Sequence, residues 1–137
     1  MENYEFGMRN SELRERTVRD NNVIAEKSKG FALRIIQLCQ LLQREKQEYV
    51  LSKQLLRSGT GIGANVREAS RGQSSADFYA KLTIALKEAD ETAYWLELLK
   101  ESGILEESLY DSLYTDCEEL IRLLVAITRT LREKEKK

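Results

Sequence analysis

The 137-residue chain contains no histidine, and this absence excludes several functions that are common among helical proteins. Di-iron bundles take metal ligands from Glu-x-x-His pairs. Phosphorelay bundles carry a phosphoryl group on histidine, and one class of helical nuclease uses histidine as its catalyst. No serine or cysteine has a candidate base of the kind that a catalytic triad needs. We therefore expect no enzyme activity, no metal site, no cofactor and no small-molecule substrate.

Proline is also absent, and cysteine and long apolar runs are scarce. A chain without proline favours long, uninterrupted helices. The two cysteines, Cys39 and Cys117, have apolar neighbours in helical patterns, which favours buried free thiols over a disulfide. No apolar run approaches the ~20 residues needed to span a bilayer, and the segment from Met1 to Asp20 lacks the apolar core of a signal peptide. We expect a cytoplasmic protein without membrane contact.

The charge of the chain is balanced. It has 22 basic and 23 acidic residues, which gives a formal net charge of -1. Net charge of this size does not indicate a general attraction to nucleic acid or to a membrane surface. Any such contact must come from a local patch of charge.

Four segments of the chain have apolar residues at three- and four-residue steps, the spacing of amphipathic helices. The pattern predicts helices over residues 22–46, 47–71, 75–102 and 106–132. Four such helices joined by short turns predict an all-α, antiparallel, up-down-up-down four-helix bundle. The predicted organisation is a polar N-terminal extension over residues 1–20, the bundle over 21–132 and a frayed charged tail over 133–137.

Several helix ends have recognisable signals. Asn21 or Asn22 is expected to cap the first helix, because a short polar side chain can accept hydrogen bonds from free amides of the first turn. Ser74 and Asp77 resemble a capping box at the start of the third helix. Gly103 is expected to end that helix.

The third and fourth helices carry more apolar residues than one core-facing stripe requires. The surplus residues are Ile84, Tyr94, Trp95, Leu98, Tyr114 and Ile121. Because a helix that is apolar nearly all round should be buried nearly all round, the surplus predicts an oligomer interface on the third and fourth helices. The alternative is that Trp95 and the tyrosines only widen a seam within one chain.

The second helix contains three glycines, Gly59, Gly61 and Gly63. The segment lacks the lysine of a Walker loop and the preceding strand of a dinucleotide-binding motif. Three glycines destabilise a helix by roughly 2 to 3 kcal/mol relative to alanine, so another interaction must offset this cost. Close helix packing over Gly59 and Gly63 is one explanation, and a local break that exposes backbone amides is the other.

Four basic residues share one face of the second helix, opposite its apolar line. They are Lys53, Arg57, Arg67 and Arg71. A basic ridge of this kind could follow a phosphate backbone. The alternative is a solvated face on which the cations pair with carboxylates. The candidate pairs join Arg57 or Arg67 to Glu68, Glu88 or Glu91.

Two motifs carry a family resemblance. LSKQLLRSGTGIGANV runs from Leu51 to Val66, and IALKEADET runs from Ile84 to Thr92, followed by Tyr-Trp-Leu. From Asn21 to Arg132 the chain resembles the four-helix-bundle proteins encoded in intervening sequences of bacterial 23S rRNA genes, also called S23 ribosomal proteins. The resemblance implies a bundle that assembles as a ring-like homopentamer, in a family without an established enzymatic activity.

The resemblance also implies kinship with the accessory variability determinant of diversity-generating retroelements, a pentameric barrel that binds nucleic acid and a reverse transcriptase. It implies packing roles for Gly59 and Gly63, and it implies that Glu88 and Glu91 pair with Arg57 or Arg67. The retroelement relative is strongly basic, whereas the composition of this chain gives an isoelectric point of about 5.7. This difference argues against tight RNA binding.

Together these features predict a non-catalytic, oligomeric helical scaffold with weak contact to RNA or a ribonucleoprotein through the second helix. The alternative is a pure protein–protein interaction module that makes no nucleic-acid contact.

Overall fold

The computed structural model describes the backbone of residues 10–135 and the side chains of residues 21–133. This part of the chain forms four helices and contains no strand. The helices are α1 (Asn10–Lys46), α2 (Val50–Ser70), α3 (Ser75–Glu101) and α4 (Glu107–Glu135). The all-α, four-helix prediction is confirmed.

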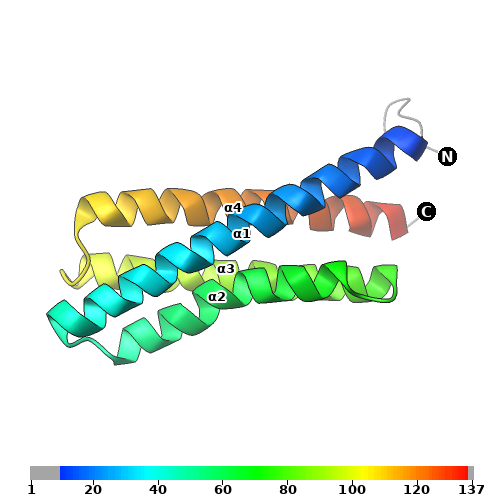
Figure 1. The fold of residues 1–137 in the computed structure, drawn as a ribbon. Helices are drawn as coiled ribbons and strands as arrows, with labels where there is room; N and C mark the ends of the chain where they lie inside the picture. The colour runs from blue at the N-terminus through cyan, green and yellow to red at the C-terminus, as the bar shows by residue number, and fades with distance from the viewer. Residues whose placement is uncertain (1–9, 136–137) are drawn as a thin grey trace.

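The helices pack in chain order. α1 packs against α2, α2 against α3 and α3 against α4, and α1 also packs against α4. Figure 1 shows that the three connections alternate between the two ends of the bundle and that α1 runs obliquely across it. The turn between α2 and α3 lies at the same end as the start of α1 and the end of α4.

The predicted helix boundaries are correct at α3 and wrong at α1. The Ser74 hydroxyl accepts a hydrogen bond from the Asp77 backbone N–H at 3.1 Å, and Gly103 follows the end of α3 with a φ of 80°. Asn21 and Asn22 lie inside α1, which begins at Asn10. No proline or glycine lies between Asn10 and Asn22, so nothing in that segment stops the helix from extending toward the N-terminus.

The two predicted terminal segments are partly described. Residues 10–20 of the predicted extension are helical, and residues 1–9 lie outside the described part of the chain. Residues 133–135 of the predicted tail continue α4, and residues 136–137 lie outside the described part.

The N-terminus of α2 has a cap that the sequence pattern did not reveal. The Glu48 carboxylate accepts hydrogen bonds from the backbone N–H groups of Val50, Leu51 and Ser52 at 3.1, 3.0 and 2.7 Å. Gln47, the residue before it, has a φ of 49°. This left-handed residue turns the chain sharply enough for the next side chain to reach the first turn of α2.

The apolar stripes of the four helices form one core. Its fully buried large side chains include Ile35, Leu55, Leu96 and Leu124, and burial of each contributes about 1.5–3 kcal/mol. The thiols of Cys39 and Cys117 are free and buried in this core, as predicted. In the described part of the chain, no helix has the length and apolarity required to cross a bilayer.

Candidate nucleic-acid interface

The glycine segment of α2 is continuous helix, so it offers no exposed backbone loop. A Cβ atom at Gly59 would lie 2.8 Å from Ile35 Cγ2, and one at Gly63 would lie 3.4 Å from the Ser28 carbonyl oxygen. Both neighbours belong to α1. The missing side chain at Gly59 lets α2 lie close against α1, whereas a Cβ atom at Gly63 would reach no closer than van der Waals contact.

Gly61 faces a different neighbour, the carboxylate of Glu88 on α3. A Cβ atom at Gly61 would lie 2.7 Å from Glu88 Oε2, so this glycine leaves room for the carboxylate beside α2. The Gly61 carbonyl oxygen accepts a hydrogen bond from Asn65 Nδ2 at 2.8 Å, which gives the half-buried amide a partner. Sequence reasoning did not assign Gly61 this role, because the contact involves a side chain of another helix.

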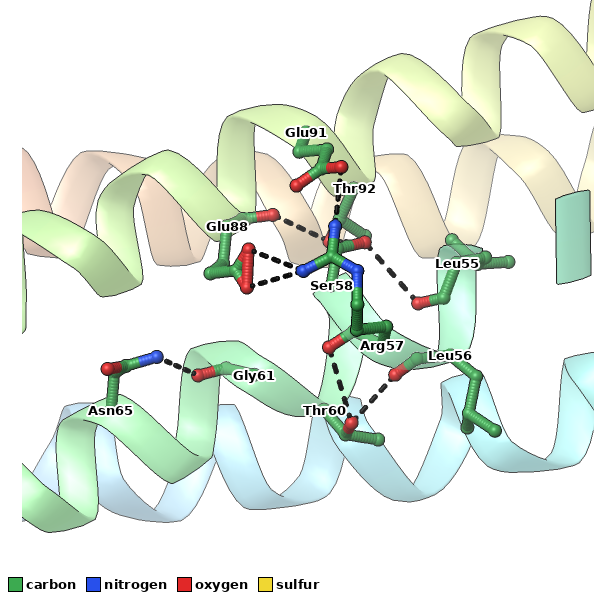
Figure 2. Close-up of polar contacts among 10 residues, drawn as sticks. All are labelled: Leu55, Leu56, Arg57, Ser58, Thr60, Gly61, Asn65, Glu88, Glu91 and Thr92. Carbon is green, nitrogen blue, oxygen red and sulfur yellow. Dashed lines mark hydrogen bonds and ion pairs between the residues drawn. The ribbon is translucent and has the colours of Figure 1, made fainter. Parts of the chain in front are cut away.

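Arg57, in the middle of the predicted basic stripe, pairs with two carboxylates. Figure 2 shows its guanidinium group between Glu88 and Glu91, at N···O distances of 3.2 and 2.6 Å. The hydrogen bond from Arg57 is the largest influence on Glu91 and lowers the pKa of that carboxyl group. The same pairing raises the pKa of Arg57. Two carboxylates more than balance one guanidinium, so this site does not attract phosphate.

A buried polar contact lies next to this ion-pair cluster. Thr92 Oγ1 lies 2.8 Å from Ser58 Oγ and 2.7 Å from the Glu88 carbonyl oxygen. Ser58 belongs to α2 and the other two residues to α3 (Figure 2). The contact therefore holds α2 and α3 in register at the level of the Arg57 ion pairs.

The other three residues of the predicted stripe remain accessible. Lys53, Arg67 and Arg71 are exposed, and none of them forms an ion pair with another described side chain. Lys53 lies near the start of α2, whereas Arg67 and Arg71 lie at its end. The structure therefore divides the stripe into a paired centre and two accessible ends.

Arg67 and Arg71 line a groove of about 830 Å³ between α1, α2 and the beginning of α3. Lys29 of α1 and Lys81 of α3 add two further cations to its lining. Glu68 is the single carboxylate among the lining residues and pairs with Lys81 at 2.8 Å. Between these charges the lining consists mainly of small residues. They are Ala25, Ala32, Thr60, Gly63, Ala64 and Ser70.

Sequence reasoning missed Lys29 and Lys81 because projection of one helix groups only residues of that helix. Lys29 lies on α1, Arg67 on α2 and Lys81 on α3. Only the packing of α1 and α3 beside the end of α2 brings the three helices' cations to one groove. We refer to Lys29, Arg67, Glu68, Arg71 and Lys81, with the small residues between them, as the basic groove.

The six surplus apolar residues of α3 and α4 divide into two groups. Ile84 and Tyr94 are 42% and 54% exposed. The remaining four are half-buried. Tyr114 is held within one chain, because its hydroxyl donates to Glu97 Oε2 at 2.7 Å and its ring stacks on Tyr110 at a centroid distance of 5.0 Å. The hydrogen bond to Glu97 is the largest cause that raises the pKa of Tyr114.

Other chemistry is sparse in the described part of the chain. Between residues 21 and 133, no three His, Cys, Asp or Glu side chains gather where they could hold a metal ion. Burial raises the pKa of the Cys39 thiol to about 11 and that of the Cys117 thiol to about 12. Neither thiol is therefore an activated nucleophile.

The fold defines a class of protein: a four-helix bundle whose second helix is packed closely against the first through a glycine. Among family models, the one described as 23S rRNA-intervening sequence protein matches residues 20–126. The chain belongs to this family, which confirms the resemblance seen in the sequence motifs.

A solved structure agrees with this assignment. The chain is 51% identical to a protein of unknown function from the S23 ribosomal protein family of Bacteroides thetaiotaomicron, whose crystal structure is at 1.70 Å resolution. The similarity covers 80% of this chain and 98% of that chain, with a TM-score of 0.79. No curated protein matches the chain.

Proposed function

We propose that this protein is a non-catalytic, self-associating helical scaffold of the cytoplasm that contacts RNA or a ribonucleoprotein through the basic side of α2. The observation that carries the proposal is the set of exposed cations without described ion-pair partners, Lys53, Arg67 and Arg71. An accessible cation releases counterions when it meets phosphate, whereas a cation already paired to a carboxylate gains little.

The scaffold part of the proposal includes its assembly. We propose an antiparallel bundle with up-down-up-down topology that assembles as a ring-like homopentamer. Ile84 and Tyr94 project from α3, on a helix other than the one that carries Arg67 and Arg71. Self-association through α3 and α4 would bury these apolar side chains and leave the basic side of α2 accessible.

Catalysis has little support from the residues present. The chain has no histidine, and both thiols are buried with raised pKa values. General acid–base and nucleophilic catalysis depend on groups whose pKa lies near the working pH. We therefore assign the protein a binding role.

A charge-reversal variant tests the proposal. Replacement of the three stripe residues without described ion-pair partners by glutamate (Lys53→Glu, Arg67→Glu, Arg71→Glu) should abolish binding of a structured RNA. Helix content and native mass should match those of the wild type, because these side chains are exposed. Unchanged RNA binding would remove the basic side of α2 from the account.

The second candidate function is a protein–protein interaction module. The exposed Ile84 and Tyr94 favour it, and in this case the basic side of α2 is only a solvated face. Isolation of the tagged protein from lysate, with and without nuclease, separates the candidates. Partners that bind through RNA are lost after nuclease treatment, whereas direct protein partners remain.

A further inference from the structure

The basic groove concentrates positive charge in a chain whose net charge is negative. Its described lining residues include four cations and one carboxylate, which gives a local net charge of +3, whereas the whole chain has a net charge of -1. Glu68 already pairs with Lys81. Lys29, Arg67 and Arg71 form no ion pair with a described side chain. Among the described side chains, no carboxylate occupies these three cations.

The shape of the groove suits the phosphate backbone of a nucleic acid better than its bases. Small residues separate the cations, so an anionic ridge can approach the helices closely. Arg71 caps the C-terminal end of α2 four positions after Arg67, so the two residues are separated by about one helical turn, roughly 6 Å along the axis. Each can therefore contact a different phosphate. The spacing favours a chain of phosphates over one isolated anion.

The groove lacks the residues that bind single strands. No aromatic side chain is among its described lining residues, whereas proteins that bind single-stranded nucleic acid stack successive bases on aromatic rings. In a duplex the bases already stack on each other, and the phosphates form the exposed ridge. Contacts to phosphate fix position but do not read sequence.

We propose that the basic groove binds the phosphate backbone of a nucleic-acid duplex, without sequence preference, through Lys29, Arg67 and Arg71. The inference rests on the proposed nucleic-acid function and narrows it. The contact lies at one end of α2, it includes a cation from α1, and its target is double-stranded. Glu68 opposes the incoming phosphates and limits the affinity.

The test is fluorescence anisotropy of the full-length protein with three labelled probes of one sequence: an RNA duplex, the matching DNA duplex and the single-stranded RNA. The groove variant is Lys29→Gln, Arg67→Gln, Arg71→Gln. The control variant, Lys46→Gln, Lys87→Gln, Arg122→Gln, removes the same charge from exposed positions outside the groove and outside the basic stripe of α2. Circular dichroism and native mass show whether each variant keeps its fold and assembly.

The wild type should bind the duplexes more tightly than the single strand. The groove variant should bind a duplex at least about tenfold more weakly, and its slope of log affinity against log salt should be shallower by about 3 units, since each lost phosphate contact changes the slope by about 0.9. Glu68→Gln should bind more tightly than the wild type. The control variant should retain most of the affinity.

Four results would overturn the inference. They are tighter binding of the single strand, an unchanged affinity in the groove variant, equal losses in the groove and control variants, and weaker binding by Glu68→Gln. In these cases the proposed nucleic-acid function survives if the wild type binds any probe. Absence of binding to all three probes at low salt would instead refute the proposed function itself.

Discussion

Three glycines within helices have different surroundings, and alanine at each should change the free energy of unfolding differently. Gly30, Gly59 and Gly61 all lie in helices. Alanine is favoured over glycine in a helix by about 0.8–1.0 kcal/mol, so this gain is common to the three substitutions. The difference between them must come from what the added methyl group meets.

At Gly59 the methyl group meets the core. It would lie 2.8 Å from Cγ2 and 2.9 Å from Cγ1 of Ile35, a side chain that is 0% exposed and has no room to move. Overpacking of this kind costs about 1–3 kcal/mol, which equals or exceeds the propensity gain. We expect Gly59→Ala to lower the unfolding free energy by as much as about 2 kcal/mol.

Gly30 and Gly61 serve as matched comparisons. A methyl group at Gly30 meets nothing within 4 Å, so Gly30→Ala should stabilise the protein by about 0.5–1 kcal/mol. At Gly61 it meets the flexible end of Glu88, which can swing away from Arg57. Because a surface ion pair contributes only about 0–1 kcal/mol, Gly61→Ala should be close to neutral.

Urea unfolding followed by far-ultraviolet circular dichroism measures these changes. All variants must be compared at one protomer concentration, because self-association couples to stability. A double-mutant cycle with Ile35→Ala isolates the contact, and we expect a coupling energy of about 1–3 kcal/mol. If Gly59→Ala stabilised the protein as much as Gly30→Ala does, the close packing of α2 on α1 would be wrong.

Three further predictions concern charge, thiols and assembly. Arg57 holds the pKa of Glu91 below its ordinary value, so the contribution of Glu91 to stability should be complete above about pH 4.3 and lost as the pH falls through the lowered pKa. Stability–pH curves of the wild type and Glu91→Gln should converge in acid, and a constant gap would contradict the pairing. Burial raises the pKa of Cys39 and Cys117, so a disulfide reagent at about pH 8 should label them only after unfolding; rapid labelling of the folded protein would refute their burial. Tyr94→Asp should weaken self-association and preserve helix content, and an unchanged native mass would remove Tyr94 from the interface.

The sequence predicted the elements of the fold because their signals are local. Helical periodicity located all four helices, and the signals at Ser74 and Gly103 located the two ends of α3. The start of α1 was misplaced, since an asparagine can cap a helix or continue one, and the choice depends on the chain before it. The Glu48 cap was missed because it depends on the left-handed backbone at Gln47.

The candidate site was predictable only in part, because it is built from three helices. The stripe on α2 follows from the spacing within one helix, and so does the burial of its opposite face. That spacing does not predict that Arg57 forms ion pairs with Glu88 and Glu91. It also does not predict that Lys29 and Lys81 line the same groove as Arg67. Both depend on how α1 and α3 are placed against α2.

The most direct test of the scaffold account is the native mass of the purified full-length protein, alone and with an equimolar structured RNA, at low salt. The account predicts a homo-oligomer at micromolar protomer concentration whose mass increases by that of the bound RNA. A monomer that gains no mass from RNA would contradict both self-association and nucleic-acid contact.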